Sequence, residues 1–221
     1  MGTIIVAGMG PLLGLGIAKR FGREGNRVAM IARNADALRA YETQLAGLGI
    51  EAAGFATDLS NPGEIERAFG QIRARFGAVD ILEFSPTNWN KGGYESTQAL
   101  TTTVESAKFD FDLLVLGAIA CARQVIPSMI ERGNGAIFFS TGYSAIHPIP
   151  FITSLCISNA GLRNYAYCLH EELKPKGVYV GTVSINALIA DGTAADPVTI
   201  ADLYWDMFEK RDRIESVFGP V

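Results

Sequence analysis

A glycine-rich turn near the N-terminus constrains the fold of this chain more than any other feature. Residues 6–16 read Val-Ala-Gly-Met-Gly-Pro-Leu-Leu-Gly-Leu-Gly, after a β-branched run at residues 3–6 and before a helical pattern. Glycines allow positive φ and close approach of the backbone to a ligand. The helix that follows would present free N–H groups and the positive end of its dipole. This pattern predicts a dinucleotide site at the first turn, the alternative being a turn that only packs a helix onto a strand.

Strand and helix signals alternate along nearly the whole chain. The sequence predicts strands at 3–7, 27–31, 51–55, 79–84, 135–140, 178–184 and 216–218. It predicts helices at 14–24, 35–48, 62–76, 106–131, 152–174 and 197–210. Such alternation is typical of a parallel sheet covered by helices on both faces, and right-handed crossovers make it doubly wound. We therefore expect a single Rossmann-like α/β domain over residues 1–221.

Composition narrows the class of protein. A chain of 221 residues is long enough for one sizeable core, and 48% hydrophobic with 19% charged residues excludes disorder. The net charge of −4 comes from scattered residues of both signs, so we expect no nucleic-acid partner. The cysteines lie in apolar helical stretches without metal-ligand spacing, which predicts reduced core residues and no metal site: Cys121, Cys156 and Cys168.

Two further patterns bear on location and assembly. The N-terminus has no basic region before an apolar run, and the longest apolar run, 113–122, is too short for a bilayer. We therefore expect a cytoplasmic protein without a membrane partner. The helices near 106–131 and 152–174 are apolar on more than one face, which predicts a homodimer or homotetramer, or else extra burial under loops.

Two segments are predicted to be active-site loops. Residues 86–105 are polar, carry Trp89 and Tyr94, and form a connection of a length that is usually functional. Residues 186–197 follow the sixth predicted strand, at the edge of the sheet where this fold places its ligands.

The whole chain resembles the short-chain dehydrogenase/reductase family. Gly10, Gly14 and Gly16 have the spacing of the family's Gly-x-x-x-Gly-x-Gly loop, in a turn longer than usual, and Asp58-Leu59 matches its adenine-contacting pair. Residues 76–82, 135–140 and 197–205 match further family segments. The resemblance implies that a dinucleotide contacts Gly8, Gly10, Leu13, Gly14, Leu15, Arg33, Asn34, Asp58, Leu59 and Ser85.

The end of the second predicted strand bears on the choice of cofactor. An acid there would bind the ribose hydroxyls and repel a 2′-phosphate. This chain has Ala32, followed by Arg33 and Asn34, and arginine can bind a phosphate through two hydrogen bonds. The sequence therefore favours NADP over NAD, with a solvated surface arginine as the alternative.

The resemblance breaks at the residues that transfer protons. The family uses a Tyr-x-x-x-Lys pair, a Ser before it and an Asn in the preceding long helix. Alignment on residues 159–162 and 127–129 implies that this tetrad is replaced by Leu114, Gly142, Leu155 and Asn159.

Other side chains near the fifth strand are candidate substitutes. Tyr143 is a phenol like the family's acid, Ser144 follows it, and His147 has an imidazole that exchanges protons near neutral pH. Tyr143 is alternatively a packed loop aromatic, and His147 a solvated turn residue. Glu83, in the fourth strand, is either a structural acid that binds loop amides or a catalytic carboxylate.

Three functions follow from these observations. The first is an NADP-dependent oxidoreductase that acts on a small carbonyl or alcohol with a non-standard catalytic site. The second is a catalytically silent NADP-binding protein with a sensing or assembly role. The third, which has the least support, is non-redox chemistry in the same cleft.

Overall fold

The computed structural model describes residues 2–87 and 97–220, and it contains one parallel sheet of seven strands. The strand order is β3-β2-β1-β4-β5-β6-β7, and every neighbouring pair is parallel. The predicted fold class is confirmed. The strands are β1 (Thr3–Ala7), β2 (Arg27–Ala32), β3 (Ala52–Ala56), β4 (Ile81–Phe84), β5 (Gly135–Gly142), β6 (Val178–Ile185) and β7 (Glu215–Phe218).

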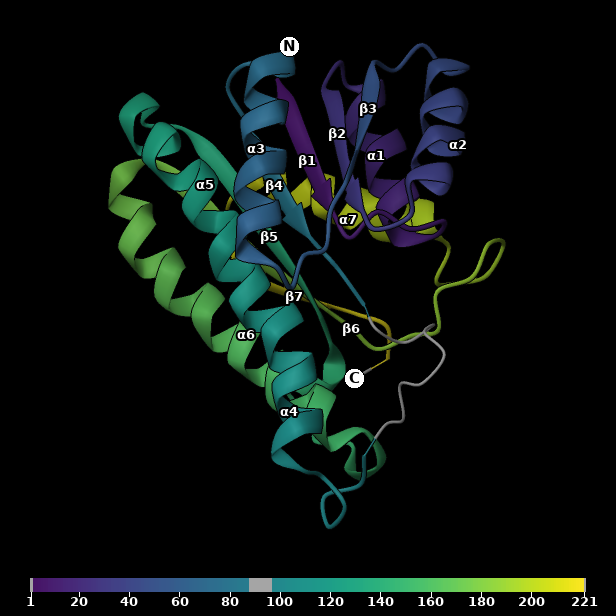
Figure 1. The fold of residues 1–221 in the computed structure, drawn as a ribbon, viewed down its shortest axis with the longest axis vertical. Coiled ribbons are helices and arrows are strands. Elements are labelled where there is room, and N and C mark those ends of the chain that lie inside the picture. The colour runs from purple at the N-terminus through teal and green to yellow at the C-terminus, as the bar shows by residue number, and fades with distance from the viewer. Residues whose placement is uncertain (1, 88–96, 221) are drawn as a thin grey trace.

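Helices cover both faces of this sheet (Figure 1). One face is covered by α3 (Pro62–Phe76), α5 (Gly117–Arg132) and α6 (Thr153–Leu173). The opposite face is covered by α1 (Leu13–Arg23), α2 (Ala35–Ala46) and α7 (Pro197–Lys210). Helix α4 (Val104–Phe111) projects beyond the carboxyl ends of the strands in Figure 1.

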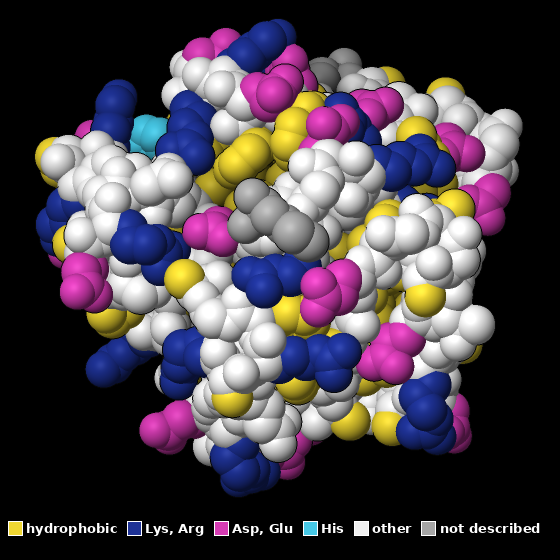
Figure 2. Space-filling model, turned by 90° about the horizontal axis from the view of Figure 1, so that it is seen from above, with side chains coloured by type: hydrophobic (Ala, Val, Ile, Leu, Met, Phe, Trp, Pro, Cys, Tyr) yellow, Lys and Arg dark blue, Asp and Glu magenta, His cyan; other side chains and the backbone are white. Residues whose placement is uncertain are grey.

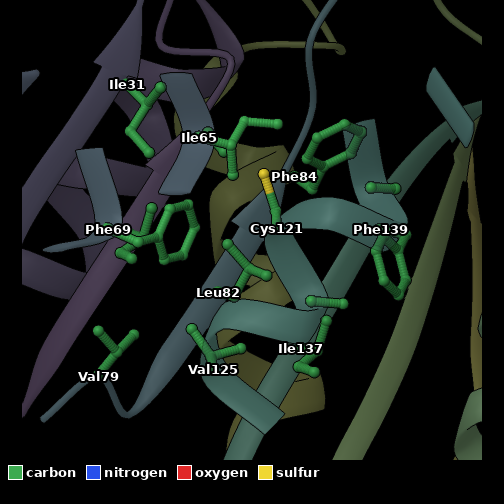
Figure 3. Close-up of a cluster of buried hydrophobic side chains, with 14 of the residues drawn as sticks. Ile31, Ile65, Phe69, Val79, Leu82, Phe84, Cys121, Val125, Ile137 and Phe139 are labelled. Atoms are coloured by element: carbon green, nitrogen blue, oxygen red, sulfur yellow. The ribbon is translucent and has the colours of Figure 1, made fainter. Parts of the chain in front are cut away.

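Two hydrophobic clusters, one on each face, hold these layers together. Figure 3 shows part of the first cluster, in which Phe84 and Phe139 of the strands lie beside Cys121 of α5. The second cluster packs Phe21 of α1 and Tyr204 of α7 on the other face. The strands carry apolar side chains on both faces because both are buried, as is typical of parallel sheets.

The order in which strands are added to the sheet reverses between β1 and β4. Strands β2 and β3 lie on one side of β1, whereas β4 to β7 lie on the other. In such sheets ligands bind outside the carboxyl ends of the strands, at this reversal. The glycine turn follows β1 and the segment from Ser85 follows β4, so both lie at the reversal.

The long helix predicted at 106–131 is continuous but irregular. A π-helical turn at Asp112–Leu116 separates α4 from α5, and π-turns occur often at functional sites. The joined helix Val104–Arg132 is long and apolar enough to cross a membrane by length and composition, although the uninterrupted apolar run is short. Half of its most apolar stretch is buried in the fold, as in a core helix. The cytoplasmic location stays a prediction.

Two sequence expectations need qualification. Cys121 is buried, but Cys168 is exposed, so the prediction that all three cysteines are core residues was wrong: Cys168 lies on the outward side of α6. The predicted loop 86–105 ends earlier, because Thr103 caps α4 and the helix begins at Val104. Trp89 and Tyr94 lie outside the described residues.

Charges of both signs mix on the surface seen in Figure 2. This view looks from above onto the end of the molecule where the N-terminus lies in Figure 1, and basic and acidic side chains alternate there. The scattered charge matches the sequence analysis on this face, while the absence of a nucleic-acid partner stays a prediction.

Candidate functional site

The glycine turn is held tightly against the ends of β2 and β4. The N–H groups of Gly8 and Met9 both donate to the carbonyl of Ile31, at 3.0 and 2.9 Å. Gly8 has a φ of 107°, and a Cβ on it would lie 2.4 Å from the nitrogen of Pro86. Glycine is therefore required at this position by backbone conformation and by close approach.

Gly10 faces open space instead. A Cβ on Gly10 would have the Gly8 carbonyl oxygen, at 3.9 Å, as its nearest neighbour. The turn thus combines one glycine that fixes its shape with one that leaves room beside the backbone. This is the shape that a ligand approaching the peptide groups needs.

Helix α1 begins at this turn without a side-chain cap. Its N-cap residue, Leu12, makes no capping hydrogen bond, whereas the side chains of Asn34, Asn61 and Asp196 cap α2, α3 and α7. Leu13 packs against the second hydrophobic cluster. The Leu15 N–H donates to the Gly10 carbonyl at 3.0 Å, and the N-terminus of α1 still presents the positive dipole end that favours an anion.

The next two glycines of the family's loop pattern, Gly14 and Gly16, contribute to packing. Gly14 and Leu15 are buried in the first turn of α1. A Cβ on Gly16 would lie 2.7 Å from the carbonyl oxygen of Pro197, so this glycine lets α1 approach α7 closely. Of the predicted cofactor residues in this region, Gly8 and Gly10 form the turn, while Leu13, Gly14 and Leu15 form the start of the helix.

A small cavity of about 120 Å³ lies beside the turn after β2. It brings Arg33 together with Asp58, although the two are far apart in the sequence. The Asp58 carboxylate is oriented because one of its oxygens accepts from the N–H and the hydroxyl of Ser60, at 2.9 and 2.7 Å. The remaining lining residues are Ser60, Phe109, Asp112 and Leu113.

Two other predicted cofactor residues have structural contacts. The Asn34 side chain accepts from the N–H groups of Asp36 and Ala37, both at 3.0 Å, and so caps α2. Leu59 is buried, and its carbonyl oxygen would lie 2.3 Å from a Cβ on Gly117 of α5. These contacts do not show whether Asn34 and Leu59 also bind a cofactor, so their cofactor-binding role stays a prediction.

A buried carboxyl group joins the ends of β4 and β5. Glu83 is 1% exposed, and its two oxygens accept from the hydroxyls of Ser140 at 2.7 Å and Ser85 at 3.0 Å. The Ser140 hydroxyl also lies 2.5 Å from that of Tyr204 in α7. Burial raises the pKa of Glu83 to about 7, although the two hydroxyl contacts lower it.

Tyr204 completes this group as a neutral member. It is fully buried, and burial raises the pKa of its phenol well above the usual range, to which the nearby Glu83 charge adds. The sequence suggested loop amides as structural partners of Glu83. In the structure its partners are the hydroxyls of Ser85 and Ser140, and the Tyr204 hydroxyl contacts that of Ser140.

The loop after β5 carries the three predicted catalytic substitutes. The ring of Tyr143 lies on that of His147, with centroids 4.7 Å apart and planes tilted by 34°. Tyr143 is half-buried and His147 exposed, whereas Ser144 is buried and its hydroxyl accepts from the Asn159 amide at 3.1 Å. The structure therefore brings Tyr143 and His147 together and fixes Ser144 against α6.

Two of the positions aligned with the family tetrad lie side by side. A Cβ on Gly142 would lie 3.4 Å from the amide nitrogen of Asn159 and 3.2 Å from the Ser144 hydroxyl. Leu114 is buried in the first hydrophobic cluster, within the π-helical turn, and Leu155 packs against that cluster. The alignment of these four residues with the tetrad stays a prediction.

A larger cavity of about 550 Å³ lies along β7, away from the glycine turn. Two of its charged side chains are paired with other side chains. Glu215 accepts from Arg163 and Tyr167, and Arg213 donates to Asp206 and Asp212. The glycine turn, with its uncapped helix, is therefore the better candidate for a ligand site.

Comparison with known proteins agrees with the fold. The family model described as short chain dehydrogenase matches residues 2–195. Dehydrogenase/reductase SDR family member 7B of Rattus norvegicus is 28% identical over 86% of this chain, which spans 62% of that relative. A short chain dehydrogenase of Pseudocercospora fijiensis is 30% identical, with 97% of this chain and 69% of the relative covered.

The solved structures show the same architecture. L-sorbose reductase from Gluconobacter frateurii, crystallised with NADPH and L-sorbose, superposes with a TM-score of 0.85 at 22% identity, covering 99% of this chain and 94% of that one. The match of the family model over most of the chain, together with the sheet order and the glycine turn, shows that this protein belongs to the short-chain dehydrogenase family.

Proposed function

We propose that the chain binds NADP(H) and acts as an oxidoreductase on a small carbonyl or alcohol, with a catalytic site that departs from the family's. The observation that carries the proposal is the uncapped N-terminus of α1, which opens at the glycine turn where Gly10 leaves space beside the backbone. Family membership and the NADPH-bound L-sorbose reductase of the same fold support it.

The residues present fit a dinucleotide. Gly8 fixes the shape of the turn, and Gly10 and the start of α1 would hold the diphosphate. Gly10 leaves space beside the backbone, and α1 presents the positive end of its dipole. Asp58, oriented by Ser60, would accept from the adenine amino group. The bound nicotinamide would supply or accept a hydride, and the chain's own side chains would have to move the accompanying proton.

Arg33 is proposed to select NADP by binding the 2′-phosphate. It is exposed beside Asp58 in the small cavity, where a guanidinium can reach such a phosphate. Arg33→Ala is expected to weaken NADPH binding about tenfold and to leave NADH binding nearly unchanged, since only NADPH loses a charge-assisted hydrogen bond. Calorimetric titration of both nucleotides measures this, with Arg39→Ala on the exposed side of α2 as the control. Tighter binding of NADH than of NADPH by the wild-type chain would contradict the assignment.

A catalytically silent NADP-binding protein is the second candidate. It is favoured by the hydrocarbon side chains of Leu114 and Leu155 and by the Asn159 amide that is bonded to Ser144. Leucine can neither give nor take a proton. The two candidates differ in turnover, which a panel of small carbonyl compounds with NADPH measures directly.

We further propose that the chain forms a homodimer or homotetramer through the helices near 106–131 and 152–174. Large apolar side chains are exposed on them, among them Leu116 at 44% and Ile157 at 48%. The double substitution of Leu116 and Ile157 by Asp is expected to shift the sedimentation coefficient to that of a monomer, because burial of a charge in an apolar interface is costly. A wild-type chain that sediments as a monomer would contradict this proposal.

A further inference from the structure

Glu83 connects the two halves of the candidate site. One carboxyl oxygen accepts from Ser85, whose carbonyl carbon would lie 2.6 Å from a Cβ on Gly8 of the glycine turn. The other accepts from Ser140, which lies in β5 shortly before Gly142 and the loop of Tyr143. Ser85 and Ser140 are both only half-buried, so each hydroxyl links the buried acid to a more accessible place.

An acid at this point of the sheet has no evident packing purpose. Its neighbours across the sheet are Val6 of β1 and Phe138 of β5, and both are completely buried. A buried carboxylate is costly, and an apolar side chain would fill the same position without that cost. The site therefore keeps a group that costs stability, which is typical of a group with a function.

The groups around Glu83 allow its carboxyl group to be either protonated or ionised. Tyr204 of α7 is the titratable side chain in contact with the network, and it is held neutral by burial. Ile17 and Ala18 of α1, packed on the same face, are apolar. The influences on the pKa of Glu83 are burial and the two serine hydroxyls, which leave it at about 7.

The charge of Glu83 decides the direction of every hydrogen bond in the network. When it is ionised, Ser85 and Ser140 both donate to the carboxylate, and Tyr204 donates to Ser140. Each serine then offers the cleft only oxygen lone pairs. When the carboxyl oxygen next to Ser85 is protonated, Glu83 donates to Ser85, whose own O–H becomes free to donate outward.

We propose that the proton on Glu83 controls binding at the glycine turn through the hydroxyl of Ser85, which donates toward the bound molecule only when Glu83 is protonated. The proton stays on Glu83: the carboxyl O–H donates to the Ser85 oxygen and the Ser85 O–H donates to the ligand, so no bond to hydrogen breaks. The inference rests on the proposed function, because the ligand is taken to be NADP. Glu83 is a positioning residue here, since it acts through Ser85.

The sign of the pH dependence follows from the hydrogen bonds. A phosphate oxygen accepts hydrogen bonds, so NADP should bind better to the form in which Glu83 is protonated and Ser85 can donate. Binding then raises the affinity of Glu83 for its proton, and a proton is taken up. NADP therefore binds more tightly below the Glu83 pKa of about 7, and its affinity falls as pH rises above that value.

The test is the binding of NADP⁺ across pH, followed by calorimetry in buffers of different ionisation enthalpy. From about pH 6 to pH 9 the wild-type dissociation constant is expected to rise about tenfold more than that of Glu83→Gln, which is permanently uncharged. Ser85→Ala should lose the same pH dependence while Glu83 remains. Glu51→Gln, the same change at an exposed position, should behave as the wild type.

A second measurement separates the inference from the proposed function. Infrared titration without nucleotide should show a carboxylic acid carbonyl band that disappears near pH 7 in the wild type and is missing from Glu83→Gln. Absence of this band, or equal pH dependence of NADP⁺ binding in wild type and Glu83→Gln, overturns the proposed control of binding by the Glu83 proton. Failure of the wild type to bind NADP⁺ at any pH overturns the proposed function, whatever the infrared titration shows of Glu83.

Discussion

Replacing Gly8 with alanine is expected to lower the free energy of unfolding by about 4 kcal/mol and to abolish binding of NADPH. Two costs add at this position. Alanine strongly disfavours a φ of 107°, which costs about 1–3 kcal/mol. Its Cβ would also lie 2.4 Å from the Pro86 nitrogen, so the turn and the end of β4 must separate, at about 1–3 kcal/mol more.

Urea denaturation gives the loss of stability, and calorimetric titration gives the loss of binding. Gly10→Ala is the matched control, since its Cβ would be 3.9 Å from its nearest neighbour. We expect Gly10→Ala to unfold within about 1 kcal/mol of the wild type. Wild-type stability of Gly8→Ala would show that the turn is not held against β4 in solution.

The fold could be predicted because its signals are local. Each strand is a short apolar run, and the helix starts are marked by residues such as Asn61, followed by Pro62 in the first turn of α3. The glycine turn could be placed for the same reason, since strand, turn and helix are consecutive. The predicted bounds differ from the observed ones by a few residues at most elements, where caps and turn geometry decide the last hydrogen bond.

The site could be predicted only in part because its contacts join distant segments. Ser140 contacts Glu83 from a different strand, and Tyr204 of α7 contacts Ser140. Nothing in the sequence near Tyr204 marks it as a partner of an acid. The one available signal was Glu83 itself, an acid inside an otherwise apolar strand, which called for hydroxyl or amide partners but did not identify them.

The π-helical turn was missed for a related reason. Residues 109–122 are apolar around most of the helix, so their pattern gives no sign of a change in helical pitch. The turn contains Leu114, which packs into the core beside the sheet. Packing of this turn into the first hydrophobic cluster and against α6 is not visible in the local sequence pattern.

Replacing Tyr143 with phenylalanine is expected to reduce NADPH-dependent carbonyl reduction by about 100-fold or more, which is the usual contribution of a positioned acid. Tyr143 follows β5 directly, at the carboxyl edge of the sheet, and its ring rests on His147. Phenylalanine keeps that ring contact and removes only the hydroxyl. Because ring packing is retained, the dissociation constant of NADPH and the urea midpoint should stay near their wild-type values.

Steady-state kinetics of Tyr143→Phe and His147→Ala together identify the proton donor. If Tyr143 donates the proton, Tyr143→Phe loses kcat, whereas His147→Ala changes it less, because the exposed imidazole acts only by supporting the ring. A larger loss in His147→Ala would transfer the role to the imidazole. Turnover that is unchanged in both variants would exclude both, and wild-type protein that binds NADPH but reduces none of the carbonyl compounds would favour the silent binding protein. In that outcome the apolar side chains of Leu114 and Leu155 have replaced the catalytic machinery and left the nucleotide turn in place.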